Sequence, residues 1–207
     1  VSLVFWPETV VPTFLLELPS FVRPLPATLS LRPPQVILGV PVRDDRDQFY
    51  NAAVLFDDSG ARQRYAKMAL VPFGEYVPFR DWLGGLFKNG MFLQADYSPG
   101  LRVAPLQTRW GKAGPMICFE STLPQHAQSQ RAAGADWLVV LTNDAWFLDS
   151  AFAARHLQMT RWRAVETGVP LFFVANTGIS AVIDPAGSVQ KQLALGKRGT
   201  IVYHFAQ

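Results

Sequence analysis

Three side chains with complementary chemistry follow short apolar segments in separate parts of the chain: Glu8, Lys67 and Cys118. A thiol is nucleophilic as its thiolate, and a nearby ammonium lowers the thiol pKa while a carboxylate can accept its proton. The same ammonium, with a backbone N–H near Phe119, can hold the oxyanion that forms when a thiolate attacks a carbonyl. The set therefore predicts acyl transfer through a thioester.

Each of these residues also has a commoner structural interpretation. A lone cysteine after an apolar strand is usually an inert small hydrophobe. Glu8 follows Pro7 and is of the type found as a solvated loop carboxylate, and Lys67 is of the type found as a surface charge. A non-catalytic binding module with Cys118 in its core is therefore one alternative to an enzyme.

Other reaction classes find little support in the sequence. His126, His156 and His204 lie apart, with no metal-ligand spacing and no cysteine partner, so we do not expect a zinc site. No Gly-x-Ser-x-Gly motif is present, which weakens a serine hydrolase, and no glycine-rich nucleotide fingerprint appears. We interpret His156 as a hydrogen-bonded core residue rather than a base.

The candidate residues fall where strands are expected to end. Side chains at strand ends can reach a common site. Apolar runs predict strands at 3–6, 36–42, 50–56, 62–67, 101–107, 112–118, 137–141, 170–175, 180–183, 189–194 and 199–205, with helices at 123–133 and 151–167. This order predicts a mixed α/β chain, a sheet sandwich covered by helices.

Composition sets outer limits on the protein. With 49% hydrophobic and 13% aromatic residues, a chain of 207 residues can bury a large core, most simply as one domain spanning 1–207. The net charge of +3 comes without a basic run, which disfavours nucleic acid and would suit an anionic lipid surface. No apolar stretch approaches the roughly 20 residues of a membrane-spanning helix, so the segment is expected to be soluble. Because it starts in mid-strand without Met, we expect it to be part of something longer.

The stretch 77–97 has a mixed character. Its large apolar residues have helical spacing, but Gly84, Gly85 and Gly90 interrupt it. Such a segment is either a poorly packed core helix or a mobile hydrophobic lid over a site.

Taken together, the motifs resemble those of a known family. Residues 6–9, Lys67 with residues 70–78, and residues 117–120 resemble the nitrilase superfamily with its Glu-Lys-Cys triad. With residues 142–147, 156–159 and 176–179, the chain is similar to the extramembrane domain of the bacterial apolipoprotein N-acyltransferase family. The resemblance runs from residue 3 to about residue 203.

The resemblance implies a nitrilase-like αββα sandwich and specific residue roles. Glu8 would act as general base, Lys67 would stabilise the oxyanion, and Cys118 would carry the acyl group as a thioester. Glu75 and Glu120 match carboxylates that position and tune the triad. A further supporting position is 119, which is often Tyr in the family and is Phe119 here.

The resemblance also implies substrates and a location. A phospholipid would donate the acyl chain and a diacylglyceryl-cysteine lipoprotein would accept it, with no metal or cofactor. The domain would lie on the periplasmic or outer face of the inner membrane, beside membrane helices and a first strand that this segment lacks. Six residues are expected to bind substrate: Trp82, Phe87, Met91 and Phe92 of the lid, with Asn143 and Trp146.

Two points stay open at this stage. The loop at 148–155 departs from the Gly- and Pro-containing segment usual in the family, which leaves its shape undetermined. A soluble carbon–nitrogen hydrolase, or amidase, using the same triad with water as acceptor, is the alternative function.

Overall fold

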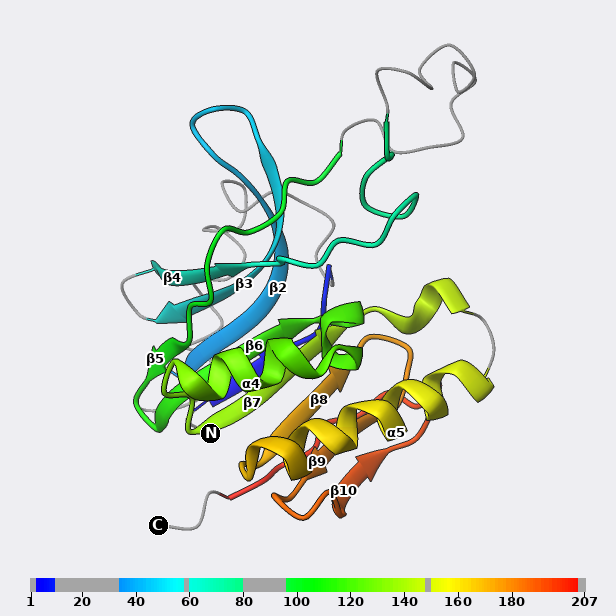
Figure 1. Cartoon of the computed structure of the whole chain (residues 1–207). Coiled ribbons are helices and arrows are strands. Elements are labelled where there is room, and N and C mark those ends of the chain that lie inside the picture. Colours follow the sequence, from blue (N-terminus) through cyan, green and yellow to red (C-terminus); the bar gives the residue numbers. More distant parts are fainter. Residues whose placement is uncertain (1–2, 10–33, 58–59, 80–95, 148–149, 205–207) are drawn as a thin grey trace.

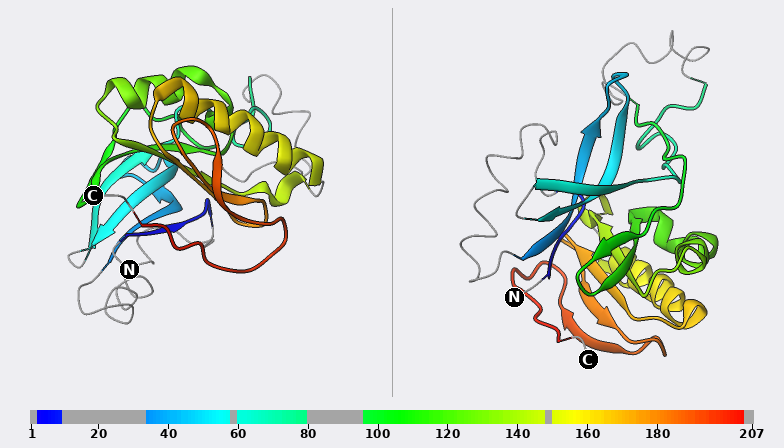
Figure 2. Two further views of the ribbon diagram at one scale, coloured as in Figure 1. Left: turned by 90° about the horizontal axis from the view of Figure 1, so that it is seen from below. Right: turned by 90° about the vertical axis from the view of Figure 1, so that its left-hand side faces the viewer.

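The structure is a computed structural model of the chain, and it describes residues 3–9, 34–57, 60–79, 96–147 and 150–204. Two sheets lie face to face, and two helices cover the outer face of the larger sheet (Figures 1 and 2). Within the described residues, no helix is both long and apolar enough to cross a membrane.

The first sheet consists of four strands in the order β1-β2-β3-β4. Their bounds are β1 Leu3–Trp6, β2 Gln35–Arg43, β3 Phe49–Asp57 and β4 Gly60–Ala66. Strand β1 runs parallel to β2, and the other neighbours are antiparallel. Apolar residues form both faces of β2 and β3, and almost all of these strands is buried, as their sequence predicts.

The second sheet has six strands in the order β10-β9-β8-β7-β6-β5. Their bounds are β5 Leu106–Thr108, β6 Gly111–Ile117, β7 Trp137–Thr142, β8 Leu171–Ala175, β9 Ser180–Ile183 and β10 Val189–Leu193. The central strands β6, β7 and β8 are parallel, so their carboxyl ends meet at one edge of the sheet. That edge positions the candidate site.

Helices α4 (Pro124–Ala132) and α5 (Ser150–Thr167) make the connections between these parallel strands. Each ends before a glycine in the left-handed conformation, Gly134 at φ 92° and Gly168 at φ 67°. Two short 3-10 helices, η2 (Cys118–Thr122) and η3 (Asp144–Phe147), begin at the carboxyl ends of β6 and β7. The predicted helices are confirmed to within about one residue at each end.

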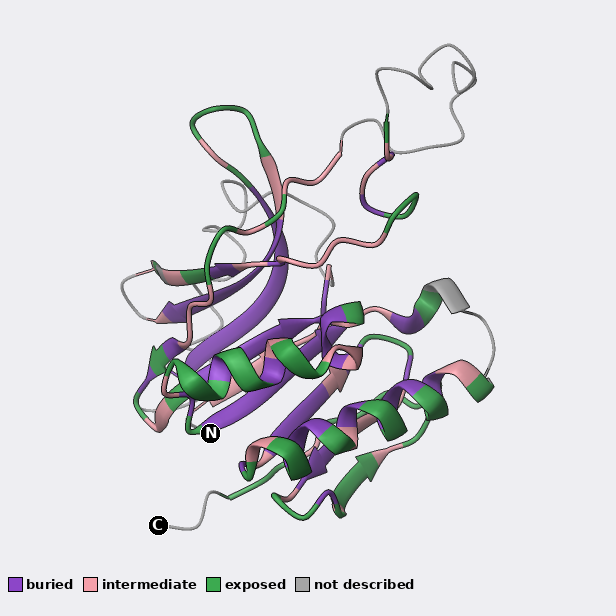
Figure 3. Cartoon of the chain, viewed as in Figure 1, coloured by how far each residue is buried: buried purple, intermediate pink, exposed green. Residues whose placement is uncertain are grey.

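Buried apolar side chains form three clusters. Figure 3 shows in purple that the buried residues follow the central strands of both sheets. One cluster lies between the two sheets and includes Leu55, Ile117 and Leu141. A second lies between the larger sheet and the helices, and a third covers the outer face of the smaller sheet, where Leu38 is fully buried. The smaller sheet therefore has apolar, buried residues on both faces.

Two predicted strands are wrong or too long. Residues 101–105 form a loop and only Leu106–Thr108 is strand, since Gly100 crosses the end of β4 so closely that a Cβ there would lie 2.1 Å from the Ala66 carbonyl oxygen. Residues 199–204 form no strand. They are held instead by side-chain contacts, such as the Tyr203 ring 5.7 Å from the Phe172 ring.

Candidate active site

Three strand ends bring Glu8, Lys67 and Cys118 together. Glu8 lies two residues after β1, Lys67 directly after β4, and Cys118 directly after β6. The Lys67 Nζ lies 3.9 Å from Glu8 Oε1, and both groups act electrostatically on the Cys118 thiol. The carboxylate and the ammonium thus come from the smaller sheet and the thiol from the larger one.

A close backbone approach sets the position of Glu8. Gly39 of β2 packs against the turn that carries Glu8, and a Cβ at Gly39 would lie 2.5 Å from the Glu8 Cα. The Glu8 side chain is buried, with Oε1 accepting a hydrogen bond from Asn51 Nδ2 at 2.6 Å. Its Oε2 accepts one from the Asn143 backbone N–H at 2.8 Å, so the carboxylate spans both sheets.

Lys67 is paired with a second buried carboxylate. Its Nζ lies 2.9 Å from Glu75 Oε1 and 2.8 Å from Glu75 Oε2, and only 1% of Lys67 is exposed. Asn51 Nδ2 also donates to Glu75 Oε1 at 2.9 Å. Asn51 therefore bridges Glu8 and Glu75, a role that the sequence reasoning missed although a single amide in the apolar strand β3 was a visible signal.

The backbone of Cys118 is strained. The strand ends at Ile117, one residue earlier than predicted, and Cys118 opens η2 with φ 49°, a left-handed value that is rare for a residue with a side chain. Such conformations persist only where neighbouring contacts over-determine them, and they concentrate at functional sites. Two contacts do so here: Ile117 N–H donates to Glu120 Oε2 at 2.8 Å, and Ser121 Oγ donates to the Cys118 carbonyl at 2.9 Å.

Glu120 connects this turn to the segment that follows Lys67. The Glu120 side chain is fully buried, and its Oε1 accepts hydrogen bonds from Tyr65 Oη at 2.8 Å, Met68 N–H at 2.6 Å and Ala69 N–H at 3.1 Å. Because Oε2 is bound at Ile117, the two oxygens join the carboxyl ends of β4 and β6. The geometry supports a structural role in aligning the two ends.

Replacing Glu120 by glutamine should lower the free energy of unfolding by about 1–3 kcal/mol, because the amide NH2 must then face a hydrogen-bond donor. Urea unfolding measures the effect. The matched control is Asp45→Asn, which removes an exposed carboxylate and should change the free energy of unfolding by less than about 0.5 kcal/mol. Equal losses in the two variants would contradict the proposed alignment by Glu120.

Burial and charge together set the protonation of the cluster. Burial, joined by the Glu8 carboxylate, raises the pKa of Cys118 to about 12, although Lys67 and a hydrogen bond with Thr142 oppose the rise. Burial also raises the pKa of Glu8, although Lys67 and the two asparagines draw it back. Burial alone would lower the pKa of Lys67. The negative charges of Glu8, Cys118 and Glu75 outweigh this effect, so the pKa of Lys67 is raised. The resting site thus holds a thiol, a charged lysine and a carboxyl of increased basicity.

The remaining predicted residues stand as follows. Asn143 contributes its backbone N–H to Glu8, while its side chain accepts a hydrogen bond from Ala145 N–H at 3.2 Å. Phe119 is 41% exposed beside Cys118. The expected substrate contacts Trp82, Phe87, Met91 and Phe92 lie outside the described residues, as does the side chain of Trp146 and part of the divergent loop at 148–155.

The ends of the segment 77–97 lie beside the cluster. The Val77 N–H donates to Asp96 Oδ1 at 3.2 Å, and the Tyr97 N–H donates to the Glu75 carbonyl at 2.8 Å. Both ends of this segment are therefore fixed near Glu75. Burial, with the charges of Glu75 and Glu8, raises the pKa of Tyr97, a site neighbour that the sequence reasoning did not single out.

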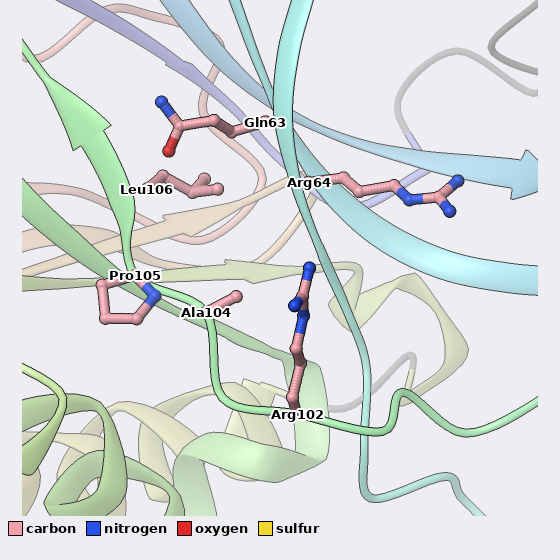
Figure 4. Close-up of a pocket in the computed structure, with 6 residues that line it drawn as sticks. All are labelled: Gln63, Arg64, Arg102, Ala104, Pro105 and Leu106. Atoms are coloured by element: carbon pink, nitrogen blue, oxygen red, sulfur yellow. The ribbon is translucent and has the colours of Figure 1, made fainter.

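Two other kinds of site where chemistry could occur are a metal site and a surface pocket. Among the residues that the structure describes, no three or more His, Cys, Asp or Glu side chains are grouped to hold a metal ion. Figure 4 shows a surface pocket lined by Gln63, Arg64, Arg102, Ala104, Pro105 and Leu106. None of the candidate residues lines it, and in this view Arg64 extends away from the other five side chains.

A comparison of folds defines the class of the protein. A nitrilase-superfamily member of Saccharomyces cerevisiae superposes with a TM-score of 0.67 over 96% of this chain and 74% of that one, at 19% identity. The nitrilase-like α/β sandwich expected from the sequence is therefore confirmed.

The sequence model of the carbon-nitrogen hydrolase family matches residues 1–207, and the chain belongs to this family. Two relatives bear the name apolipoprotein N-acyltransferase. One, from Geobacter metallireducens, is 36% identical over 91% of this chain and 37% of its own length. The other, from Haemophilus ducreyi, is 36% identical over 99% of this chain and 42% of its own length. The chain thus spans about two fifths of these relatives.

Proposed function

We propose that this chain carries the active centre of an apolipoprotein N-acyltransferase. It would move a fatty acyl chain from a phospholipid, through a thioester on Cys118, to the α-amine of a diacylglyceryl-cysteine lipoprotein. The observation that carries the proposal is the buried cluster of Glu8, Lys67 and Glu75 around the thiol of Cys118. The name apolipoprotein N-acyltransferase, borne by relatives 36% identical to this chain, supports the choice of a lipoprotein amine as the acceptor.

The first half-reaction forms the thioester. Because the resting thiol is protonated, Glu8 must take its proton as Cys118 Sγ attacks the ester carbonyl of the donor. Lys67 Nζ and the Phe119 N–H would stabilise the oxyanion of the tetrahedral intermediate. As that intermediate collapses, the C–O bond breaks and the lysophospholipid leaves with the proton from Glu8.

The second half-reaction transfers the acyl chain. The α-amine of the acceptor attacks the thioester carbonyl, Glu8 accepts an amine proton, and the C–S bond breaks to release the amide. The proton then returns to the Cys118 thiolate. Glu75 stays paired with Lys67 throughout, which would keep the ammonium aimed at the oxyanion rather than at Glu8.

The substrates would enter from a membrane surface. Phe119 is 41% exposed. Phe73, in the stretch that follows Lys67, is 51% exposed, and Phe79, near the start of the segment 77–97, is 80% exposed. We propose that the segment 77–97 forms a hydrophobic lid there, whose acyl-chain contacts would be Trp82, Phe87, Met91 and Phe92. Asn143 and Trp146, which follow β7, would contact the substrate from the larger sheet. The domain would lie at the periplasmic or outer face of the inner membrane.

Intact-mass measurement tests the proposal. The chain in mixed micelles of detergent and phospholipid should gain the mass of one acyl group, and a synthetic diacylglyceryl-cysteine peptide should remove it. The matched control is the same peptide with its α-amine acetylated, which should leave the adduct in place. The full-length relative from Geobacter metallireducens, assayed alongside, verifies donor and acceptor quality.

The family description favours one alternative, a carbon–nitrogen hydrolase that uses water as the final acceptor. In that case the adduct would disappear equally with the free and the acetylated peptide, and small amides would be hydrolysed without lipid. Either result would overturn the acyltransferase proposal while keeping Cys118 as the nucleophile.

A further inference from the structure

A set of buried side chains, linked by hydrogen bonds, surrounds Cys118. Ser121 Oγ donates to the Cys118 carbonyl and lies 2.8 Å from His156 Nε2. His156 Nδ1 lies 3.1 Å from Asp144 Oδ1, which also accepts a hydrogen bond from Thr142 Oγ1 at 2.9 Å. Thr142 is the neighbour of Cys118 across the paired ends of β6 and β7, and its hydroxyl lowers the pKa of the thiol, so Thr142 links Asp144 back to the cysteine.

Four elements converge to build this ring of residues. Strands β6 and β7 are paired with Ile117 opposite Leu141, so the next position on each strand places Thr142 beside Cys118. Ser121 comes from η2, Asp144 from η3 and His156 from α5. All four side chains around the cysteine are buried: Ser121 and Thr142 are 0% exposed, His156 2% and Asp144 5%. Neither water nor substrate has ready access to them.

The sequence of contacts Ser121–His156–Asp144 is that of a serine hydrolase triad. The serine is nevertheless unavailable as a second nucleophile. It is fully buried, its one proton lies between two buried acceptors, the Cys118 carbonyl and His156 Nε2, and it accepts a hydrogen bond from Thr160 Oγ1 at 3.0 Å. The contacts therefore act on the cysteine rather than on a substrate.

We propose that Ser121, His156, Asp144 and Thr142 are positioning residues that hold Cys118 at both its carbonyl and its thiol. The proposal deepens the proposed function and rests on it, since it takes Cys118 as the nucleophile. The carbonyl arm, through Ser121, fixes the left-handed backbone of the cysteine. The thiol arm, through Thr142, fixes the direction of Sγ, and both arms share the Asp144–His156 pair as their anchor.

Proton counting gives the thiol arm a specific action. Asp144 Oδ1 accepts from both Thr142 and the His156 ring, so the Thr142 oxygen is left to accept the S–H proton of the resting thiol. When that proton passes to Glu8, the Thr142 hydroxyl can turn its own proton to the thiolate, and Asp144 keeps its hydrogen bond from His156. The hydroxyl thereby stabilises the anion, which agrees with its lowering effect on the pKa of Cys118.

Alkylation by iodoacetamide tests the ring without any acyl donor. Cys118 is the single cysteine of the chain, so the rate of mass gain reports on it alone. Thr142→Val keeps the shape and removes the hydroxyl, and it should slow alkylation about tenfold at pH 8 and move the pH profile upward by about one unit. Thr142→Ser, which restores the hydroxyl, should alkylate within about twofold of wild type.

A double-variant comparison tests whether the two arms form one ring. Ser121→Ala should also slow alkylation, and combining it with Thr142→Val should slow it by less than the product of the single effects, because both arms depend on one anchor. Thr108→Val is the matched control, since it removes a buried, hydrogen-bonded threonine hydroxyl in β5 and should leave alkylation unchanged.

The thiol arm would be overturned if folded Thr142→Val were alkylated at the wild-type rate. It would also be overturned if Thr142→Ser failed to restore that rate. If the double variant slowed alkylation by the full product of the two single effects, the shared anchor would be overturned. These results are independent of whether phospholipid acylates the chain, since Glu8, Lys67 and Glu75 remain in every variant. A chain that alkylates as predicted but gains no acyl mass would contradict the proposed function and leave the ring intact.

Discussion

Replacing Cys118 by alanine should abolish the acyl adduct and reduce acyl transfer by more than about 10⁴-fold, because no other group can form the thioester. The chain contains no second cysteine, so no neighbouring thiol can substitute. Intact mass after incubation with phospholipid measures the adduct, and release of labelled lysophospholipid measures the rate. The truncation removes one sulfur atom from a half-buried position, so the fold should be retained.

Cys118→Ser is the matched variant for this prediction. It keeps the shape and a hydrogen-bonding atom, but a hydroxyl is a far weaker nucleophile than a thiol and its acyl ester resists aminolysis. We expect no turnover and at most a slowly formed ester. An acyl adduct of wild-type amount in Cys118→Ala would place the acyl group elsewhere and reject the assignment of the nucleophile.

Replacing Lys67 by methionine should cost both activity and stability. The variant lacks the proposed oxyanion donor, which is expected to slow acylation about 10²- to 10³-fold. It also leaves Glu8 and Glu75 buried, bridged by Asn51 and without their cation. Breaking a buried pair in this way costs about 3–5 kcal/mol.

The stability loss in Lys67→Met should depend on pH in a defined direction. Without the ammonium, the pKa of Glu8, which burial already raises in the wild type, rises further in the folded variant. A raised folded pKa favours folding at low pH and disfavours it as the pH rises through that pKa. The loss relative to wild type should therefore be small near pH 4 and full at pH 7, as measured by urea unfolding.

Lys112→Met is the control, because it removes an exposed lysine from β6 of the larger sheet. It should leave acylation and the pH profile of stability unchanged. A similar loss in both variants would mean that methionine, rather than the missing charge, is responsible. A loss in Lys67→Met that is independent of pH would contradict the like-charge explanation.

Much of the fold follows from local patterns that the sequence carries. Continuous apolar runs predict the buried strands β2, β3 and β7, and glycines mark the ends of α4 and α5. The strand at 101–107 was wrong for most of its length, since its apolar alternation was overridden by the packing of Gly100 against Ala66. At 199–205 the apolar pattern predicted a strand, but the described part of this stretch has no strand neighbour.

The candidate site was only partly accessible from the sequence. Glu8, Lys67, Glu75 and Cys118 could be selected because reactive residue types follow strand-like runs and match family motifs, and their roles remain proposals. Asn51, Thr142 and Ser121 were not selected. Their side chains act through partners far away in the chain, which spacing does not identify, although the single amide in the apolar strand β3 marks Asn51 as unusual.

The sequence by itself determined the chemical inventory: one thiol, a lysine, several carboxylates and the strands that end beside them. Only the tertiary structure decided which of these groups meet and in what state. The pairing of β6 with β7 places Thr142 beside Cys118, and the packing of the two sheets buries Glu8 next to Lys67. Burial is a property of the packed whole, and it is burial that keeps the Cys118 thiol protonated and makes Glu8 a stronger base.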